Sequence, residues 1–301
     1  MAGALQTLTE LVCRVWPEHR AYLDKSIGLR SPGVLETSEI LAAAILELVG
    51  ADGRTYAEDY RWLCAQIQEE ELLFARTGAY RYSTFAETSA NVYSDAEYMG
   101  RYMNGLLLSQ TLWLMHAASL HFYRQRVGAR AKPNGAVLEV GSGHGLLLFL
   151  ALRDLGMARA VAWDLSAVSL DQTRHALATL GALDRAEFAV RDLHEGALAE
   201  GKFELVILSH LLEHMEEPVR ALRSVAEVMA PGGHLFVNVP LNAPMPDHLI
   251  LLDHPDAALQ MMKDGGFNVV DASFHTTQGV SLARAIRSKT AVTCSILAER
   301  A

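Results

Sequence analysis

Three glycines in the stretch VLEVGSGHG are spaced so that they could cradle a ligand. The stretch, Val137–Gly145, joins a short apolar segment to a helix-like one. Glycine lets the backbone turn tightly there and lets a ligand approach without meeting a Cβ atom. Gly141, Gly143 and Gly145 form the pattern GxGxG, whereas Leu146 stands where the dinucleotide pattern GxGxxG needs its last glycine. The loop therefore differs from a pyrophosphate cradle, and a structural turn is the alternative.

Acidic residues lie beside this loop and at the ends of the next two strand-like segments. Glu139 precedes the first glycine, where it would oppose a pyrophosphate but suit a ligand with a cationic amino group and a sulfonium. Asp164 ends the second segment, where a carboxylate can accept both hydroxyls of a ribose. Asp192 follows the third segment and could contact an adenine amino group.

Histidines follow the fourth and fifth strand-like segments. His210 and His214 come after the fourth segment, with Glu213 between them, and His248 comes after the fifth. Histidine is the usual base near neutral pH, so one of these three histidines could remove a proton from a substrate. As a second possibility, His210 and His214 could bind a divalent metal with Glu213 or His248. A structural role, such as His214 capping a loop, is the third.

Strands and helices alternate after a boundary near Ala131–Gly135. The expected strands are 136–140, 160–163, 187–190, 203–208, 234–239, 267–272 and 290–297, and the expected helices are 145–155, 166–180, 217–229 and 255–264. Such alternation predicts a parallel sheet with helices on both faces. The candidate side chains then lie at the carboxyl edge of that sheet, where ligands bind in such folds.

Residues 1–130 are predicted to be almost entirely helical. Helix-forming segments cover Glu39–Leu48, Tyr56–Phe74 and about Ala96–Val127, and the polar stretch Thr77–Val92 predicts a loop or short helix. Most of the last helix is expected to pack in a helix–helix core. Tyr98 and Tyr102 are one helical turn apart and are the best candidates for facing a ligand.

The composition limits the functional classes. The 301 residues are 50% hydrophobic with a net charge of −9, which predicts a folded protein of about two domains. The absence of a basic cluster argues against a nucleic-acid partner. Three separated cysteines, without CxxC spacing, favour a reducing compartment over a disulfide framework or zinc site. With neither a signal-peptide pattern nor a transmembrane run, we expect a cytoplasmic protein without a membrane partner.

The ordered motifs resemble those of class I S-adenosylmethionine-dependent methyltransferases over about residues 130–275. Beside the residues above, the resemblance includes FELVILSHLLEH at 203–214, APGGHLFV at 230–237 and DGGF at 264–267. It implies an α/β fold with a Rossmann-like, seven-stranded, mostly parallel sheet, preceded here by an all-helical N-terminal domain. Thr290–Leu297 would be the last, antiparallel strand.

The resemblance also implies where S-adenosylmethionine binds. Glu139, Gly141, Ser142, Gly143 and Gly145 would line its methionine part, Asp164 and Leu165 its ribose, and Asp192 and Leu193 its adenine, with Ser209 and His210 facing the methyl group. Tyr102 is expected to contact the cofactor, and Tyr98, Trp113 and His116 are expected to contact the acceptor. A divalent metal stays an open possibility.

Missing motifs bear on the methyl acceptor. Amino-adenine methyltransferases of this class carry Asn/Asp-Pro-Pro-aromatic after the fourth strand, where this chain has SHLL at 209–212. Cytosine methylation needs a thiolate, and the catalytic half has no cysteine before Cys294. The loosest part of the resemblance, NAPMPDH at 242–248, is to small-molecule methyltransferases of bacterial secondary metabolism and quinone synthesis.

The prediction is therefore methyl transfer to a small molecule, on oxygen, nitrogen or carbon, by in-line displacement with a histidine base. Residues 1–130 would be a lid that selects the substrate and could form a homodimer, and residues 131–301 would be the catalytic domain. The alternatives are metal-assisted C-methylation of a 2-oxo acid and a non-catalytic cofactor-binding assembly protein. Leu146 and Glu139 disfavour a nicotinamide-dependent oxidoreductase.

Overall fold

A computed structural model of the chain describes residues 3–194 and 202–301 and divides into two compact units. The helical unit comprises Met1–His121, Leu241–Leu251 and His275–Thr293, and the sheet unit comprises Phe122–Pro240, Leu252–Phe274 and Cys294–Ala301. Two segments of the C-terminal half thus belong to the helical unit, which a division after residue 130 does not anticipate. The roles expected of residues 1–130 stay predictions.

Seven strands of the described part of the chain form one sheet in the order β3-β2-β1-β4-β5-β7-β6. Their bounds are β1 Ala136–Val140, β2 Arg159–Asp164, β3 Ala186–Val190, β4 Phe203–Ser209, β5 Met229–Leu241, β6 Phe267–Thr276 and β7 Val292–Arg300. The pairings of β1 with β2 and β4, of β2 with β3, and of β4 with β5 are parallel. Central strands buried on both faces explain continuous apolar runs such as that of β4. The expected sheet is confirmed.

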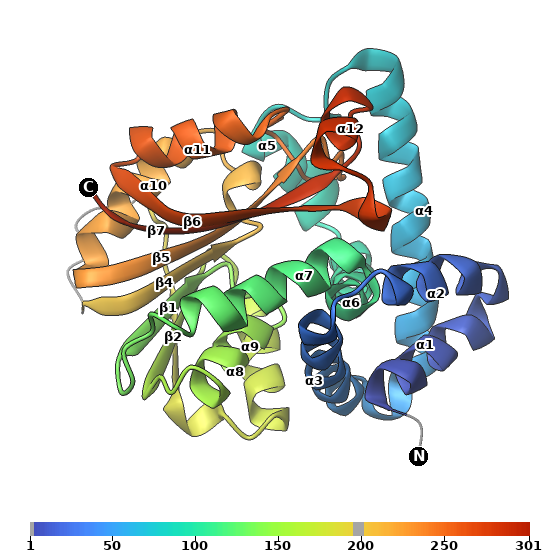
Figure 1. Cartoon of the computed structure of the whole chain (residues 1–301), viewed down its shortest axis with the longest axis horizontal. Coiled ribbons are helices and arrows are strands. Elements are labelled where there is room, and N and C mark those ends of the chain that lie inside the picture. Colours follow the sequence, from blue (N-terminus) through green and yellow to red (C-terminus); the bar gives the residue numbers. More distant parts are fainter. Residues whose placement is uncertain (1–2, 195–201) are drawn as a thin grey trace. The chain divides into compact units, whose positions relative to one another are not determined.

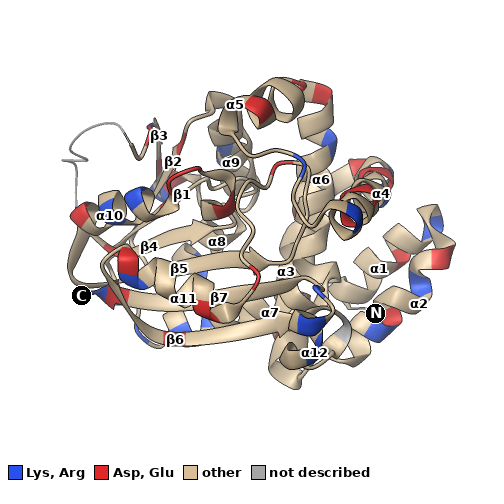
Figure 2. Cartoon of the chain, turned by 90° about the horizontal axis from the view of Figure 1, so that it is seen from above, with Lys and Arg blue, Asp and Glu red and all other residues tan. Residues whose placement is uncertain are grey.

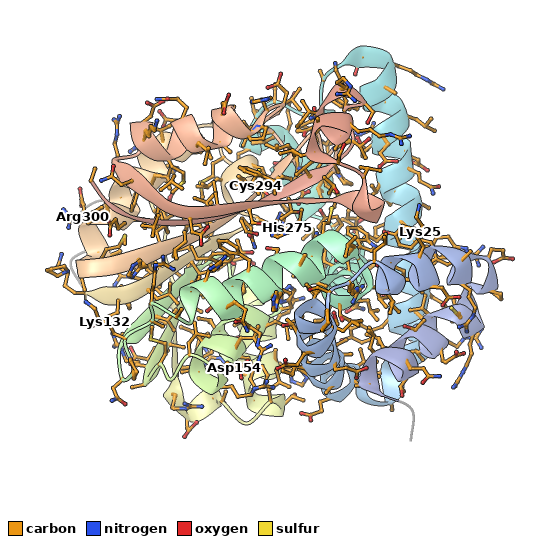
Figure 3. The ribbon with its side chains drawn as sticks, viewed as in Figure 1. Lys25, Lys132, Asp154, His275, Cys294 and Arg300 are labelled. Carbon is orange, nitrogen blue, oxygen red and sulfur yellow. The ribbon has the colours of Figure 1, made fainter. Side chains whose placement is uncertain are left out.

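Helices cover both faces of this sheet. The helices are α8 Leu146–Arg153, α9 Ala167–Thr179, α10 Pro218–Val228 and α11 Pro255–Asp264, and Figure 1 shows α10 and α11 on one face with α8 and α9 on the other. Ser166 caps α9 by accepting the N–H of Ser169, as its residue type predicts. Short turns complete the unit: the π-helical η4 Tyr123–Val127, η5 Leu183–Arg185 and η6 Leu212–His214. Buried Cys294 lies in β7 without a disulfide (Figure 3).

The helical unit is built largely on packed helices. They are α1 Ala4–Val15, α2 Arg20–Gly28, α3 Pro32–Val49, α4 Gly53–Thr77, α5 Phe85–Thr88, α6 Ala96–Leu112, α7 Leu114–Phe122 and α12 Leu282–Arg287, with the turns η1 Pro17–His19, η2 Gly50–Asp52, η3 Ser89–Tyr93 and η7 Thr277–Gly279. A Cβ added at Gly105 would lie 2.7 Å from Cβ of Leu63. Gly105 therefore lets α6 approach α4 closely.

The single helix expected over Ala96–Val127 is wrong, because the chain breaks at Trp113. This residue has extended angles, φ −88° and ψ 132°, between α6 and α7. Its indole N–H donates to the hydroxyl of Tyr60 on α4 at 2.9 Å. The backbone N–H of Trp113 donates to the carbonyl of Ser109 at the end of α6, and its backbone carbonyl accepts the N–H of Ala117 at the start of α7, so Trp113 caps both helices.

Charges of both signs are interspersed along the helices. Figure 2 shows acidic and basic residues together on α4, in accord with ion pairs such as Arg54–Glu58 at 2.8 Å. Among the described residues, none of the helices combines the length and apolar character needed to cross a bilayer.

Candidate functional site

The glycine loop, residues 141–145, connects β1 to α8. Gly141, Gly143 and Gly145 have φ values of 71°, 46° and 69°, in the region that favours glycine. The N–H of Gly145 donates to the carbonyl of Ser142 at 2.8 Å, which closes the turn. A Cβ at Gly141 would lie 3.0 Å from Cδ1 of Leu211. The loop thus packs tightly against the turn that follows β4.

Thr173 of α9 holds the other side of the loop. Its hydroxyl donates to the carbonyl of Gly143 at 2.8 Å and lies 2.8 Å from the hydroxyl of Ser142. Thr173 is fully buried. Sequence reasoning missed this residue, because the helical period of α9 does not mark a hydroxyl that contacts a distant loop.

Glu139 is a buried carboxylate at the end of β1. Its side chain is 3% exposed, and Oε2 has no hydrogen-bond partner among the described residues. Burial raises the pKa of this carboxyl well above its usual range, although the backbone N–H of Leu148 donates to it and lowers the pKa in part. A cationic group bound here would supply the missing partner. The expected contact of Glu139 with an amino group of the cofactor stays a prediction.

Asp164 ends β2 with its carboxylate already oriented. Oδ1 accepts the N–H of Ser166 at 2.8 Å, and Oδ2 accepts the hydroxyl of Ser169 at 2.7 Å. A carboxylate oxygen can accept more than one hydrogen bond, so both oxygens keep capacity for ribose hydroxyls. Leu165, the next residue, is 55% exposed.

Asp192 and Leu193 follow β3, where the adenine is expected. Oδ1 of Asp192 accepts the N–H of His194 at 2.8 Å, and Leu193 is buried. An acidic side chain and an apolar one are thus adjacent here. Their contact with adenine stays a prediction.

Asn238 of β5 fixes the end of β4. It lies opposite Ser209 in the strand register and donates to the Ser209 hydroxyl at 3.1 Å. The backbone carbonyl of Asn238 accepts the backbone N–H of His210 at 3.0 Å. Sequence reasoning missed Asn238, although an asparagine inside the apolar run LFVNVP is a usable signal, because a buried polar side chain needs a partner.

His210 forms a pair with Glu213. Nδ1 of His210 lies 3.0 Å from Oε1 of Glu213, and the side chains are 30% and 1% exposed. His210 has φ 51°, an uncommon value for a residue with a side chain. The turn after β4 is therefore shaped to hold this imidazole against a buried carboxylate.

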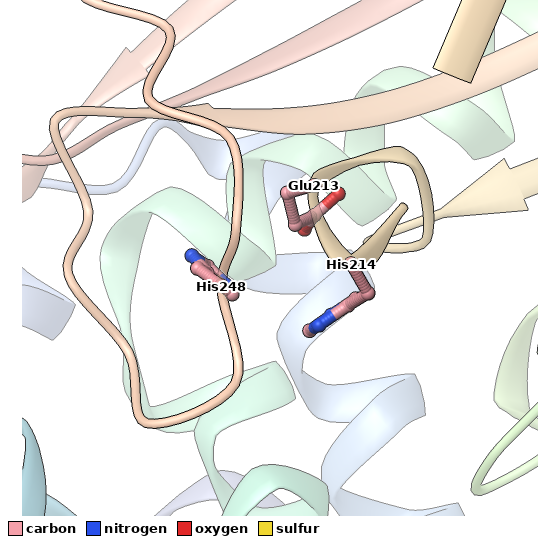
Figure 4. A group of neighbouring side chains, drawn as sticks. All are labelled: Glu213, His214 and His248. Carbon is pink, nitrogen blue, oxygen red and sulfur yellow. The ribbon is translucent and has the colours of Figure 1, made fainter. Parts of the chain in front are cut away.

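The other two candidate histidines lie on different segments. Figure 4 shows Glu213 and His214 on the turn after β4 and His248 on the loop after β5. A carboxylate oxygen of Glu213 and a ring nitrogen of His214 lie within 4.8 Å of each other. In the helical unit, Nδ1 of buried His248 lies 2.8 Å from the carbonyl of Ala243. Their part in proton transfer or metal binding stays a prediction.

In the helical unit, two tyrosines donate to one buried carboxylate. The hydroxyl of Tyr102 donates to Oδ1 of Asp247 at 2.8 Å, and that of Tyr93 donates to Oδ2 at 3.2 Å. The ring of Tyr98 stacks at 6.2 Å from that of Tyr102 and meets Trp62 edge-on at 4.8 Å. Contacts of Tyr98 and Tyr102 with acceptor and cofactor stay predictions.

Trp113 and His116 each make a polar contact with another residue of the helices. The indole of Trp113 donates to Tyr60, and Nδ1 of His116 lies 3.1 Å from the hydroxyl of Ser109. His116 is 7% exposed and packs against the ring of Trp113 at 4.9 Å. The acceptor contacts expected of both residues stay predictions.

A family profile described as a methyltransferase domain matches residues 116–286, which is more than half of the chain. The chain belongs to this family, the class I S-adenosylmethionine-dependent methyltransferases.

Curated relatives carry a more specific name. The ubiquinone biosynthesis O-methyltransferase of Xanthomonas axonopodis pv. citri is 38% identical over 114 residues, which are 37% of this chain and 46% of that protein. The enzyme of that name from Vibrio parahaemolyticus is 28% identical over 130 residues, 43% of this chain and 53% of that protein. The chain therefore spans about half the length of these relatives.

A solved structure shares the fold. Mitomycin 7-O-methyltransferase is 18% identical, with a TM-score of 0.53 over 84% of this chain and 72% of that one. At this identity the likeness bears on the fold alone.

Replacing Thr173 with valine is expected to weaken S-adenosylhomocysteine binding. Valine keeps the shape but removes the hydroxyl that holds Ser142 and Gly143, so the loop loses its support from α9. A net hydrogen bond contributes about 1 kcal/mol, which predicts a roughly 3- to 10-fold higher Kd by calorimetry and a similar loss of stability. Exposed Thr179 on the same helix provides the control, Thr179→Val. Equal affinity in both variants would contradict the role of Thr173.

Replacing Glu139 with glutamine is expected to stabilise the ligand-free protein while weakening cofactor binding. The raised pKa means that the folded state favours the protonated carboxyl. Protonated Glu139 stabilises the folded state fully below the ordinary carboxyl pKa of about 4.3. This stabilisation is lost as the pH rises through the pKa of Glu139 in the folded state. Glu139→Gln should therefore raise Tm by a few degrees at pH 7, with the difference shrinking toward pH 4.

The control for Glu139→Gln is Glu187→Gln, which changes an exposed carboxylate. Thermal unfolding of both variants across this pH range, with and without S-adenosylhomocysteine, is the measurement. A Tm of Glu139→Gln equal to that of the wild type at every pH would show that burying the charge of Glu139 does not destabilise the folded protein.

Proposed function

We propose that the chain transfers the methyl group of S-adenosylmethionine to an oxygen atom of a small-molecule acceptor. The observation that carries the proposal is the glycine loop, whose three glycines have positive φ, next to Oε2 of Glu139, which is buried and has no hydrogen-bond partner among the described residues. Relatives named O-methyltransferases favour oxygen over nitrogen or carbon. The net charge of −9 supports a small molecule over a nucleic acid.

The cofactor would be held from its two ends. The glycine loop and Glu139 would take the methionine part, Asp164 would accept the ribose hydroxyls, and Leu193 would pack beside the adenine with Asp192 at its amino group. Bound S-adenosylmethionine supplies a methyl group on a positively charged sulfur, open to attack along the S–CH3 axis. The chain contributes alignment of the acceptor with that axis, which can account for much of the lowering of the barrier.

His210 is the proposed base. In the tautomer whose Nδ1–H donates to the Glu213 carboxylate, 3.0 Å away, Nε2 carries the lone pair that would take the proton of the acceptor hydroxyl. The carboxylate of Glu213 stabilises the positive imidazolium that then forms. Asn238 contributes by fixing the backbone of His210.

The helical unit is proposed to select the acceptor. A class I sheet binds its cofactor without such an addition, and Tyr98, Trp113 and His116 provide aromatic surface and hydrogen-bonding groups for an acceptor. His214 and His248 are the second and third choices for the base. A divalent metal at the turn after β4 is the competing mechanism, because Glu213 and His214 offer a carboxylate oxygen and a ring nitrogen close together.

Calorimetry with S-adenosylhomocysteine tests binding, and release of S-adenosylhomocysteine from S-adenosylmethionine in the presence of catechol, pyruvate or glycine tests the reaction. We expect binding, and turnover with catechol. Failure to bind the cofactor at millimolar concentration overturns the proposal, and binding without turnover on a wide acceptor panel favours a non-catalytic role. Turnover abolished by EDTA and restored by Mg²⁺ favours the metal mechanism over His210 alone.

A further inference from the structure

His144 is a polar side chain of the glycine loop that the proposed function does not use. It lies between Gly143 and Gly145, both with positive φ, and its side chain is half-buried. Among the described residues, the ring makes one hydrogen bond, in which Nδ1 accepts the N–H of Leu146 at 3.3 Å. This bond fixes the imidazole at the start of α8.

The bond also decides which ring nitrogen carries the proton. A neutral imidazole has one N–H and one lone pair, so an Nδ1 that accepts a hydrogen bond leaves the proton on Nε2. Burial and the charge of nearby His210 lower the pKa of His144 to about 4, so the ring is neutral at pH 7. His144 thus presents a single donor of fixed position, Nε2–H.

We propose that Nε2–H of His144 donates a hydrogen bond to the carboxylate of the methionine part of S-adenosylmethionine. The inference rests on the proposed function and adds a cofactor-binding residue to it. The amino and carboxylate groups of the methionine part share one carbon atom, so their partners must lie close together. Glu139, near the end of β1, and His144, in the glycine loop that follows, lie on either side of Gly141 in the sequence and offer the two complementary partners, a buried carboxylate for the amino group and an N–H for the carboxylate.

The start of α8 strengthens this donor. The first N–H groups of a helix have no partner within the helix and mark its positive end. The N–H of Leu146 points at Nδ1 and polarises the ring, which makes Nε2–H a better donor through a chain of two hydrogen bonds. His144 would therefore transmit the electrostatic effect of the positive end of α8 to an anionic group.

Two variants and two ligands test the inference. In His144→Asn, the side-chain oxygen can still accept the N–H of Leu146, but the Nε2–H donor is gone. In His144→Gln, the longer amide restores an N–H near the position of Nε2. Methylthioadenosine serves as the second ligand, because it has the nucleoside and sulfur of S-adenosylhomocysteine but lacks the amino-acid end. Calorimetry gives the Kd of each ligand for the full chain and both variants.

We expect His144→Asn to weaken S-adenosylhomocysteine about 10-fold, as for a hydrogen bond to a charged group, and to leave methylthioadenosine unchanged. His144→Gln should recover most of the loss. In the wild type, the Nε2–H proton of His144 should move downfield in NMR spectra with S-adenosylhomocysteine but not with methylthioadenosine.

Other outcomes separate the inference from the proposed function. Unchanged S-adenosylhomocysteine affinity in His144→Asn overturns the inference alone. Equal weakening of both ligands also overturns it, because damage to the loop would then explain the loss. A wild-type chain that binds neither ligand overturns the proposed function, and the inference with it.

Discussion

Replacing His210 with alanine is expected to lower kcat for the acceptor about 100- to 1,000-fold while leaving the Kd of S-adenosylhomocysteine nearly unchanged. A positioned general base contributes about 10²–10⁴-fold to a rate. The pair with Glu213 orients the imidazole for this task. Glu213→Gln, which keeps a hydrogen-bond acceptor but removes the charge, should give an intermediate loss. The kcat of each variant, measured as S-adenosylhomocysteine release, is the readout.

The acidity of the acceptor gives the sharper test of His210. An acceptor that is already ionised needs no base, so the loss in His210→Ala should be much smaller with nitrocatechol than with catechol. His175→Ala is the matched control, because His175 is an exposed histidine on α9. An equal loss with both acceptors would assign His210 a role other than proton transfer, and full activity in His210→Ala would transfer the role to His214 or His248.

Replacing Asp164 with alanine is expected to weaken S-adenosylhomocysteine binding by at least about 100-fold. The carboxylate would accept two ribose hydroxyls, and a hydrogen bond to a charged group contributes about 1.5–3 kcal/mol. Methylthioadenosine contains the same ribose, so it should weaken to the same degree. This common loss distinguishes Asp164 from His144, which should affect only the ligand with the amino-acid end. Calorimetry with both ligands is the measurement.

Asp164 also supports the start of α9, since it accepts hydrogen bonds from Ser166 and Ser169. Asp164→Asn keeps an oxygen for one of these bonds and separates the loss of binding from the loss of local structure. Asp171→Ala is the control, because Asp171 is a highly exposed carboxylate of the same helix. An affinity of Asp164→Ala equal to that of the control would contradict the ribose contact.

The sequence predicted the sheet unit well because its signals are local. A buried parallel strand needs a continuous apolar run, and a strand-to-helix turn at positive φ needs glycine. The helix Pro255–Asp264 and the cap of α9 at Ser166 were predicted to the residue for the same reason. The family resemblance rests on these local signals in their order along the chain.

The helical unit was predicted less well because its decisive contacts are distant in sequence. At the break between α6 and α7, the indole of Trp113 donates to Tyr60, a residue of another helix. The inclusion of Leu241–Leu251 in the helical unit is accompanied by hydrogen bonds of Asp247 with Tyr93 and Tyr102. Helix propensity and period carry no information on such partners.

By itself, the sequence determined the fold class, the glycine loop, the acidic residues at the strand ends and the histidines that follow the fourth and fifth strands. Only the tertiary structure decided how these groups are paired: Thr173 with the loop, Asn238 with Ser209 and His210, and Glu213 with His210. It also left Oε2 of Glu139 buried without a partner among the described residues. The physical reason is that residue type sets which hydrogen bonds a side chain can make, whereas folding sets which partners come within reach.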